Sequence, residues 1–152
     1  MQSKLNHDVK TNSSLKQSTN YNYTNPEAFC AYTDAGMILF PCVGYSKVPT
    51  RAGFLDLAFD PEFMPAENNY GVLLKERFVV IDCDPRHYKE GDRPLSRLVS
   101  SIGLEGIPAT FMVNTPSGGT HIYLRKPEGV KLVNSLKEYP GLEFKKKFIM
   151  AY

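Results

Sequence analysis

The chain has 152 residues, of which 42% are hydrophobic and 12% aromatic, a composition that excludes a wholly disordered or fibrous protein. Eighteen Lys and Arg residues against 16 Asp and Glu residues give a formal net charge of +2, so there is no global basic field to hold a polyanion. Any preference for a charged partner must therefore come from local clusters of charge.

The first 24 residues are rich in Asn, Ser, Thr, Lys and Gln, which predicts a flexible polar tail before a single domain over residues 25–152. No apolar stretch of the chain has the length of a signal-peptide core or a membrane span, and its three cysteines lack metal-binding spacing. We therefore expect a cytoplasmic protein with no membrane partner. The apolar run over residues 148–152 predicts that the domain is truncated at its C-terminus.

Glycine, proline and short polar residues separate the apolar runs and mark where the expected helices and strands begin and end. Asn25 and Pro26 predict the start of a helix, and Gly36 predicts its end. A helical turn is expected over 53–59, and a second helix over 93–101 with Asp92 as its N-terminal cap. The expected strands cover residues 37–40, 70–74, 77–81, 110–114, 120–124 and two segments within 142–152. This order predicts an α+β fold with a mixed, largely antiparallel sheet and flanking helices.

The sharpest local signal is the acidic pair Asp82 and Asp84 after the apolar strand 77–81. Because side chains alternate along a strand, both carboxylates point to the same side. Two like charges this close need a cation, and hard oxygen ligands suit Mg²⁺ or Mn²⁺ with phosphate completing the shell. The same pair also occurs at solvated strand ends, so the triplet alone leaves both interpretations open.

Two later segments carry further polar candidates. His121 leaves the glycine-rich turn 117–119, where backbone N–H groups and an imidazole can meet a triphosphate, although a solvent-facing strand histidine fits as well. Glu143 lies between two apolar residues on an expected strand, so it points either into the cleft of the aspartates or onto a solvated face. The following run 145–147 is basic, and it either engages phosphates or forms a solvated turn.

Taken in order, Asp82-x-Asp84, the segment 115–121 and the segment 141–145 resemble the archaeo-eukaryotic primase superfamily. The chain is most similar to the bifunctional primase/polymerase domains of phages and plasmids, which have an RRM-like catalytic core, and the resemblance covers roughly residues 26–152. It implies a DNA primase and DNA-directed polymerase, a nucleotidyltransferase of DNA replication that takes nucleoside triphosphates and a single-stranded DNA template. A replicative helicase, as a domain or a subunit, is a further implied partner.

The resemblance also implies roles for individual residues. Asp82, Asp84 and Glu143 would be catalytic and would hold two divalent ions, Mg²⁺ or Mn²⁺, for phosphoryl transfer. The residues implied to bind the nucleotide are Lys47 of the basic loop 47–51, Ser117, Gly118, Gly119, His121 and Lys145.

Two other functions are compatible with the same residues. One is a non-catalytic nucleic-acid-binding module, in which the basic run 145–147 and Arg77, Arg86 and Arg93 bind template and the acids are structural. That module predicts salt-sensitive binding without metal dependence. The other is a metal-dependent nucleotidyltransferase acting on a different nucleotide-activated substrate, which would need no template.

Overall fold

The computed structural model describes residues 26–44, 46–59 and 69–152, with the side chains of residues 26–28 outside the description. Within these ranges the chain forms two antiparallel sheets and few helices, which confirms the expected α+β class. The sequence predicted one sheet, and the structure divides the strands between two. The predicted tail, residues 1–24, lies outside the described residues.

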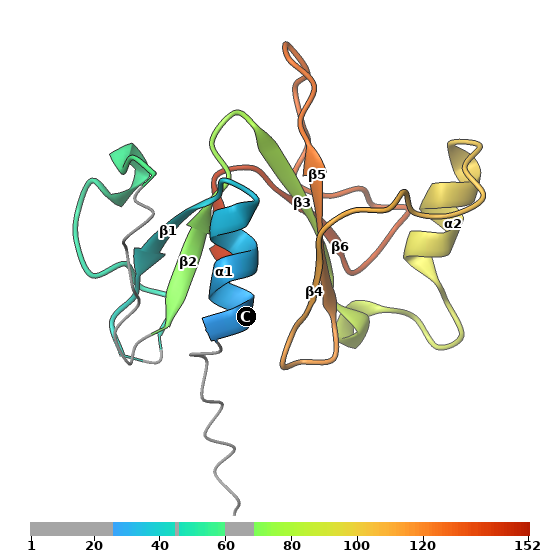
Figure 1. Cartoon of the computed structure of the whole chain (residues 1–152). Helices are drawn as coiled ribbons and strands as arrows, with labels where there is room; N and C mark the ends of the chain where they lie inside the picture. Colours follow the sequence, from blue (N-terminus) through green and yellow to red (C-terminus); the bar gives the residue numbers. More distant parts are fainter. Residues whose placement is uncertain (1–25, 45, 60–68) are drawn as a thin grey trace, which may run out of the picture.

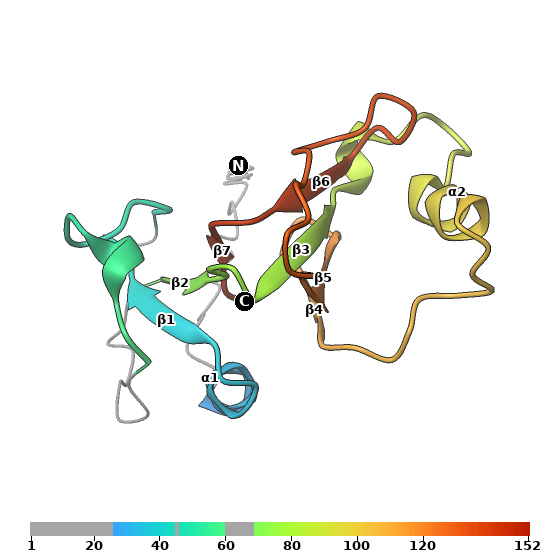
Figure 2. The same cartoon turned by 90° about the horizontal axis from the view of Figure 1, so that it is seen from above.

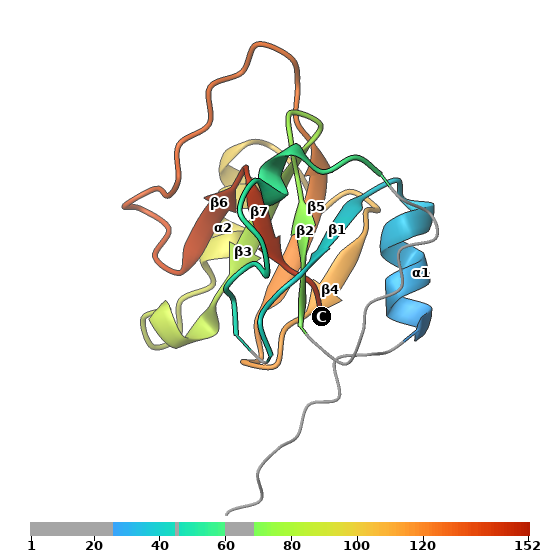
Figure 3. The same cartoon turned by 90° about the vertical axis from the view of Figure 1, so that its left-hand side faces the viewer.

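The two sheets contain strands that are far apart in the sequence (Figure 1). The first has the order β1-β2-β7, from β1 (Ile38–Pro41), β2 (Tyr70–Leu73) and β7 (Phe148–Met150). The second has the order β4-β5-β3-β6, from β3 (Phe78–Cys83), β4 (Met112–Asn114), β5 (Thr120–Arg125) and β6 (Leu142–Lys145). Figure 3 shows the first sheet lying over the face of the second.

The helices begin and end at the predicted breakers. α1 (Pro26–Asp34) is followed by Gly36 with φ of 70°, and α2 (Pro94–Ser101) by Gly103 with φ of 78°. Short 3-10 helices, η1 (Phe54–Asp56) and η2 (Pro85–His87), complete the described helices. None of the described helices is long and apolar enough to pass through a bilayer.

The predicted cap of α2 is wrong. Arg93 stands at the N-cap and its side chain makes no capping hydrogen bond. The Asp92 carboxylate instead accepts a hydrogen bond from Arg97 Nε at 2.8 Å. The Arg97 guanidinium makes two charge-assisted hydrogen bonds to this carboxylate, which are stronger than bonds from the first-turn amides of the helix.

Three layers follow one another in Figure 2, the first sheet, the second sheet and α2. The main core lies between the sheets and includes Tyr32 of α1, Leu74 after β2, and Val80 of β3, all fully buried. The opposite face of the second sheet carries Cys83 and Ile122 against α2. Because β3 alternates, Asp82 shares the face of Val80 and looks toward the first sheet.

The chain crosses between the sheets at two neighbouring places. The turn expected after β2 exists, with Lys75 at φ of 47°, but it joins strands of different sheets. The second crossing runs from β6 to β7 through Lys146 and Lys147. Leu74 N donates a hydrogen bond to Lys147 O at 2.9 Å, so the β2–β3 and β6–β7 connections are bonded to each other.

Candidate active site

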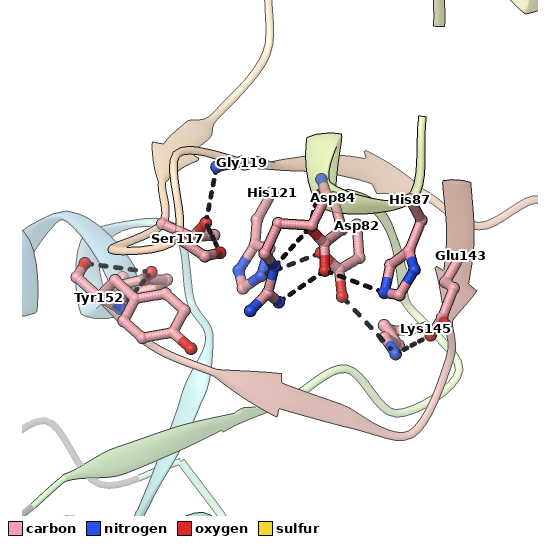
Figure 4. Close-up of polar contacts among 12 residues, drawn as sticks. Asp82, Asp84, His87, Ser117, Gly119, His121, Glu143, Lys145 and Tyr152 are labelled. Atoms are coloured by element: carbon pink, nitrogen blue, oxygen red, sulfur yellow. Dashed lines mark hydrogen bonds and ion pairs between the residues drawn. The ribbon is translucent and has the colours of Figure 1, made fainter. Parts of the chain in front are cut away.

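Three of the predicted site residues form a row across the second sheet. Asp82 of β3 is paired with His121 of β5 on one side and with Glu143 of β6 on the other. Directly opposite residues in antiparallel strands project to the same face, so the three side chains lie next to one another. Figure 4 shows them together, with His121 Nε2 at 3.6 Å from Asp82 Oδ1.

A cavity of about 860 Å³ opens over this row, bounded by residues from both sheets. The predicted site residues that line it are Lys47, Asp82, Asp84, Ser117, His121, Glu143 and Lys145. Gly118 and Gly119 instead line a second cavity of about 300 Å³, together with Cys83 and Arg93. The structure therefore brings together seven of the nine predicted residues at one cavity and places the two glycines at its neighbour.

Asp84 is held by Arg86. Its Oδ1 accepts from Arg86 Nε at 2.9 Å and from the backbone N of Arg86 at 3.1 Å, and its Oδ2 accepts from Arg86 Nη2 at 2.6 Å. The backbone bond caps η2, because Asp84 is its N-cap residue and Pro85 opens it. Hydrogen bonding to the guanidinium lowers the pKa of Asp84 to about 2, so this carboxylate is ionised at neutral pH.

Lys145 lies beside the other two acids. Its ammonium donates to Glu143 Oε2 and lies 3.6 Å from Asp82 Oδ2. Partial burial lowers the pKa of Lys145, but the hydrogen bonds and negative charges of Glu143 and Asp82 together outweigh it, so the pKa is raised overall. Each of the three acids therefore has a cationic side chain of its own chain as a partner.

His121 is a neutral group in this site. Only 3% of the residue is exposed, and burial lowers its pKa to about 4 against the attraction of Asp82. Its ring lies against the ring of Tyr152, with centroids 5.4 Å apart, and Nδ1 has no hydrogen-bond partner among the residues that the structure describes. At neutral pH the imidazole therefore offers one N–H donor and no positive charge.

The turn between β4 and β5 is closed by Thr115. Gly118 N donates to Thr115 O and Gly119 N donates to Thr115 Oγ1, both at 3.0 Å, so two amides expected to face a triphosphate are already bonded within the turn. A Cβ on Gly119 would overlap the carbonyl oxygen of Cys83, which explains why glycine stands there. Ser117, whose Oγ is 3.0 Å from Thr115 Oγ1, lines the large cavity.

A family model for the N-terminal domain of bifunctional DNA primase/polymerases matches residues 30–151. The chain belongs to this family. The match covers both sheets and the whole row of His121, Asp82 and Glu143, and it confirms the resemblance drawn from the three sequence motifs. None of the curated proteins compared with the chain matches it.

The acids of this primase/polymerase domain are suited to a hard divalent ion by their chemistry. Carboxylate oxygens are the ligands that Mg²⁺ and Mn²⁺ prefer, and the two ion pairs show that the cavity wall attracts cations. Within the described part of the chain, however, no three His, Cys, Asp or Glu side chains are grouped closely enough to hold one ion. Asp84 is turned to Arg86 and Glu143 to Lys145, so an ion has to compete with these cations for the oxygens.

Sequence reasoning considered Arg86 only as a template-binding residue and did not foresee its fork on Asp84. A signal was present in Asp84-Pro85-Arg86, since an Asp before Pro commonly bonds the backbone two residues on. The places of Thr115 and Tyr152 in the cavity wall were also missed. Nothing local in the sequence indicates the place of Tyr152.

Proposed function

We propose that this primase/polymerase domain catalyses template-dependent nucleotidyl transfer, both primer synthesis and DNA polymerisation, by a two-metal mechanism. The observation that carries the proposal is the register that aligns His121, Asp82 and Glu143 on one face, with Asp84 two residues beyond Asp82. Family membership supports the reaction class. The volume of about 860 Å³ also falls in the range of roughly 300–1,000 Å³ typical of small-ligand sites.

In this proposal Asp82, Asp84 and Glu143 are the catalytic residues and hold Mg²⁺ or Mn²⁺. The bound ions would activate the primer 3′-hydroxyl and neutralise the leaving pyrophosphate. The protein supplies the position of these carboxylates, because Asp82 and Glu143 project from paired strands of one sheet and Asp84 follows β3 as the N-cap residue of η2.

The remaining residues of the cavity bind the triphosphate. His121 donates a neutral N–H to a phosphate oxygen, and Ser117 adds a hydroxyl from the turn that Gly118 and Gly119 shape. Lys47 and Lys145 both line the cavity and contribute positive charge from different sheets, since Lys47 lies in the loop after β1 and Lys145 ends β6. The nucleotide would therefore lie between the two sheets, over the row of acids.

The wider setting also belongs to the proposal. Family membership supports a single-stranded DNA template, and the resemblance supports a cytoplasmic role in phage or plasmid replication beside a replicative helicase. Lys147 is exposed at the crossing next to the cavity and supplies local positive charge for a template strand.

The test is incorporation of labelled deoxynucleotides with Mn²⁺, with and without a single-stranded template. Asp82→Ala and Asp84→Ala are each expected to abolish incorporation with unchanged circular dichroism. Asp56→Ala is the matched control, because this exposed acid of η1 does not line the cavity. Retained incorporation by both variants would reject the assignment.

The pairing of all three acids with Arg86 and Lys145 favours a second candidate, a nucleic-acid-binding module whose acids are structural. That candidate predicts DNA binding that weakens with salt and does not depend on metal. Template-independent incorporation would instead indicate a transferase for another substrate. The same assay, with a DNA-binding measurement in EDTA, separates these outcomes.

A further inference from the structure

Arg86 occupies both oxygens of Asp84, the acid that the proposed function assigns to a metal ion. Its Nε and Nη2 lie 2.9 Å and 2.6 Å from Oδ1 and Oδ2, the fork geometry in which a guanidinium binds a carboxylate most strongly. A divalent ion needs at least one of these oxygens. The ion and the guanidinium therefore compete for the same atoms.

The guanidinium can leave Asp84 without disturbing the fold. Its side chain is 66% exposed, so most of its surface is in contact with solvent before it moves. The backbone N of Arg86 also bonds Asp84 Oδ1, at 3.1 Å, and this bond does not involve the guanidinium. The carboxylate would thus keep its orientation in η2 when the side chain moves away.

A released Arg86 remains a cation at the site, because a guanidinium does not lose its proton in proteins. It lines the same cavity as Ser117 and His121, the groups proposed to meet the phosphates. A triphosphate entering this cavity brings pairs of phosphate oxygens that can accept two hydrogen bonds from the planar guanidinium, as the Asp84 carboxylate did. The phosphates of the nucleotide therefore offer Arg86 a new anionic partner within the same cavity.

We propose that Arg86 exchanges partners during nucleotide binding, holding Asp84 in the metal-free protein and moving to the phosphates of an incoming nucleoside triphosphate when a divalent ion takes Asp84. This inference rests on the proposed function, since it needs Asp84 as a metal ligand. It makes Arg86 a nucleotide-binding residue that also couples the two bindings, because metal and nucleotide are each bound more readily together than apart.

Arg86→Gln tests the exchange, because it should change the affinity for Mn²⁺ and the affinity for nucleotide in opposite directions. Without nucleotide, Mn²⁺ binding followed by electron paramagnetic resonance is expected to tighten about two- to fivefold, the usual worth of an exposed ion pair. With Mn²⁺ present, binding of a fluorescent deoxynucleoside triphosphate is expected to weaken about tenfold or more, the worth of a charged hydrogen bond. Arg86→Lys keeps the charge but not the fork, so it should retain part of the nucleotide affinity.

The matched control is Arg93→Gln, which removes the same charge from an exposed residue that lines only the smaller cavity. It should change neither binding. If Arg86→Gln also changes neither, or weakens Mn²⁺ binding alone, the exchange is wrong and Arg86 is a surface ion pair or a support for Asp84. Asp84→Asn separates the two proposals, because unchanged Mn²⁺ binding in that variant contradicts the proposed function itself.

Discussion

Gly141 fixes the backbone next to Asp84, and its replacement by alanine should be costly for two separable reasons. Its φ is 80°, in the left-handed region where a Cβ costs about 1–2 kcal/mol. A Cβ there would also lie 2.7 Å from Asp84 O and 2.5 Å from Cδ1 of Tyr88. Carbon normally meets a carbonyl oxygen at about 3.3 Å or more, so either the backbone of Asp84 or the chain at Gly141 must shift.

The size of the second effect follows from that overlap. Forcing an extra carbon into a packed place costs about 1–3 kcal/mol. Together with the backbone cost, Gly141→Ala should lower the free energy of unfolding by about 3 kcal/mol. Gly129→Ala is the matched control, because Gly129 has φ of 73° but nothing within 4 Å of its Cβ position, and it should lose about 1 kcal/mol. At about 2–4 °C per kcal/mol, the melting temperatures should fall by about 9 °C and about 3 °C.

The assay is thermal unfolding by circular dichroism at pH 7, with template-dependent incorporation measured below both melting temperatures. Gly141→Ala should also lose incorporation, because Asp84 N donates to Gly141 O at 2.8 Å and follows any shift of that residue. Equal melting temperatures for the two variants would show that the overlap carries no energy. The reasoning from the close approach would then be refuted.

Three further predictions concern the rest of the domain. Burial lowers the pKa of His121 from 6.5 to about 4, so the unfolded chain binds more protons than the folded protein between these pH values. In EDTA the free energy of unfolding should therefore fall as pH falls from 6.5 to 4. Urea titrations should show a shallower fall in His121→Gln, and an equal fall would contradict a buried, neutral His121. Gly71→Ala should destabilise the first sheet by about 1–3 kcal/mol, because its Cβ would overlap the Phe40 ring, and a double-mutant cycle with Phe40→Leu should recover part of the loss. Arg97→Ala removes a hydrogen bond to Glu138 O and a stacking contact on Tyr139, so limited proteolysis should cut the 126–141 connection faster than in wild type, and an unchanged rate would contradict this.

Strand periodicity predicted part of the candidate site. It put Asp82 and Asp84 on one side, and in the structure Asp82 shares the face of Val80 while Asp84, just after β3, lines the same cavity. It left two directions open for Glu143, which the pairing of β6 with β3 decides. The glycines after the two α-helices mark where those helices end, since a left-handed residue stops a helix locally. These features depend on a few adjacent residues, which a single sequence contains.

Features that depend on choices between distant partners were not predictable in the same way. The turn at Lys75 looks like a hairpin locally, but β2 pairs with β7 and β3 with β5, so the strands fall into two sheets. The partner of Asp84 was likewise not predicted, since the Arg86 guanidinium holds its carboxylate in the structure. Local pattern fixes where a side chain points, and competition among partners fixes what it binds.

The cross-strand row of His121, Asp82 and Glu143 has a consequence for how the protein folds. A slip of one residue in β5 or β6 would turn His121 or Glu143 to the face packed on α2 while Asp82 stayed in place. Apolar neighbours such as Ile122 and Leu142 would then enter the cavity, so such a slip also ruins the core. Correct assembly of the core and correct alignment of His121, Asp82 and Glu143 are therefore one event, and a refolded molecule should have both or neither.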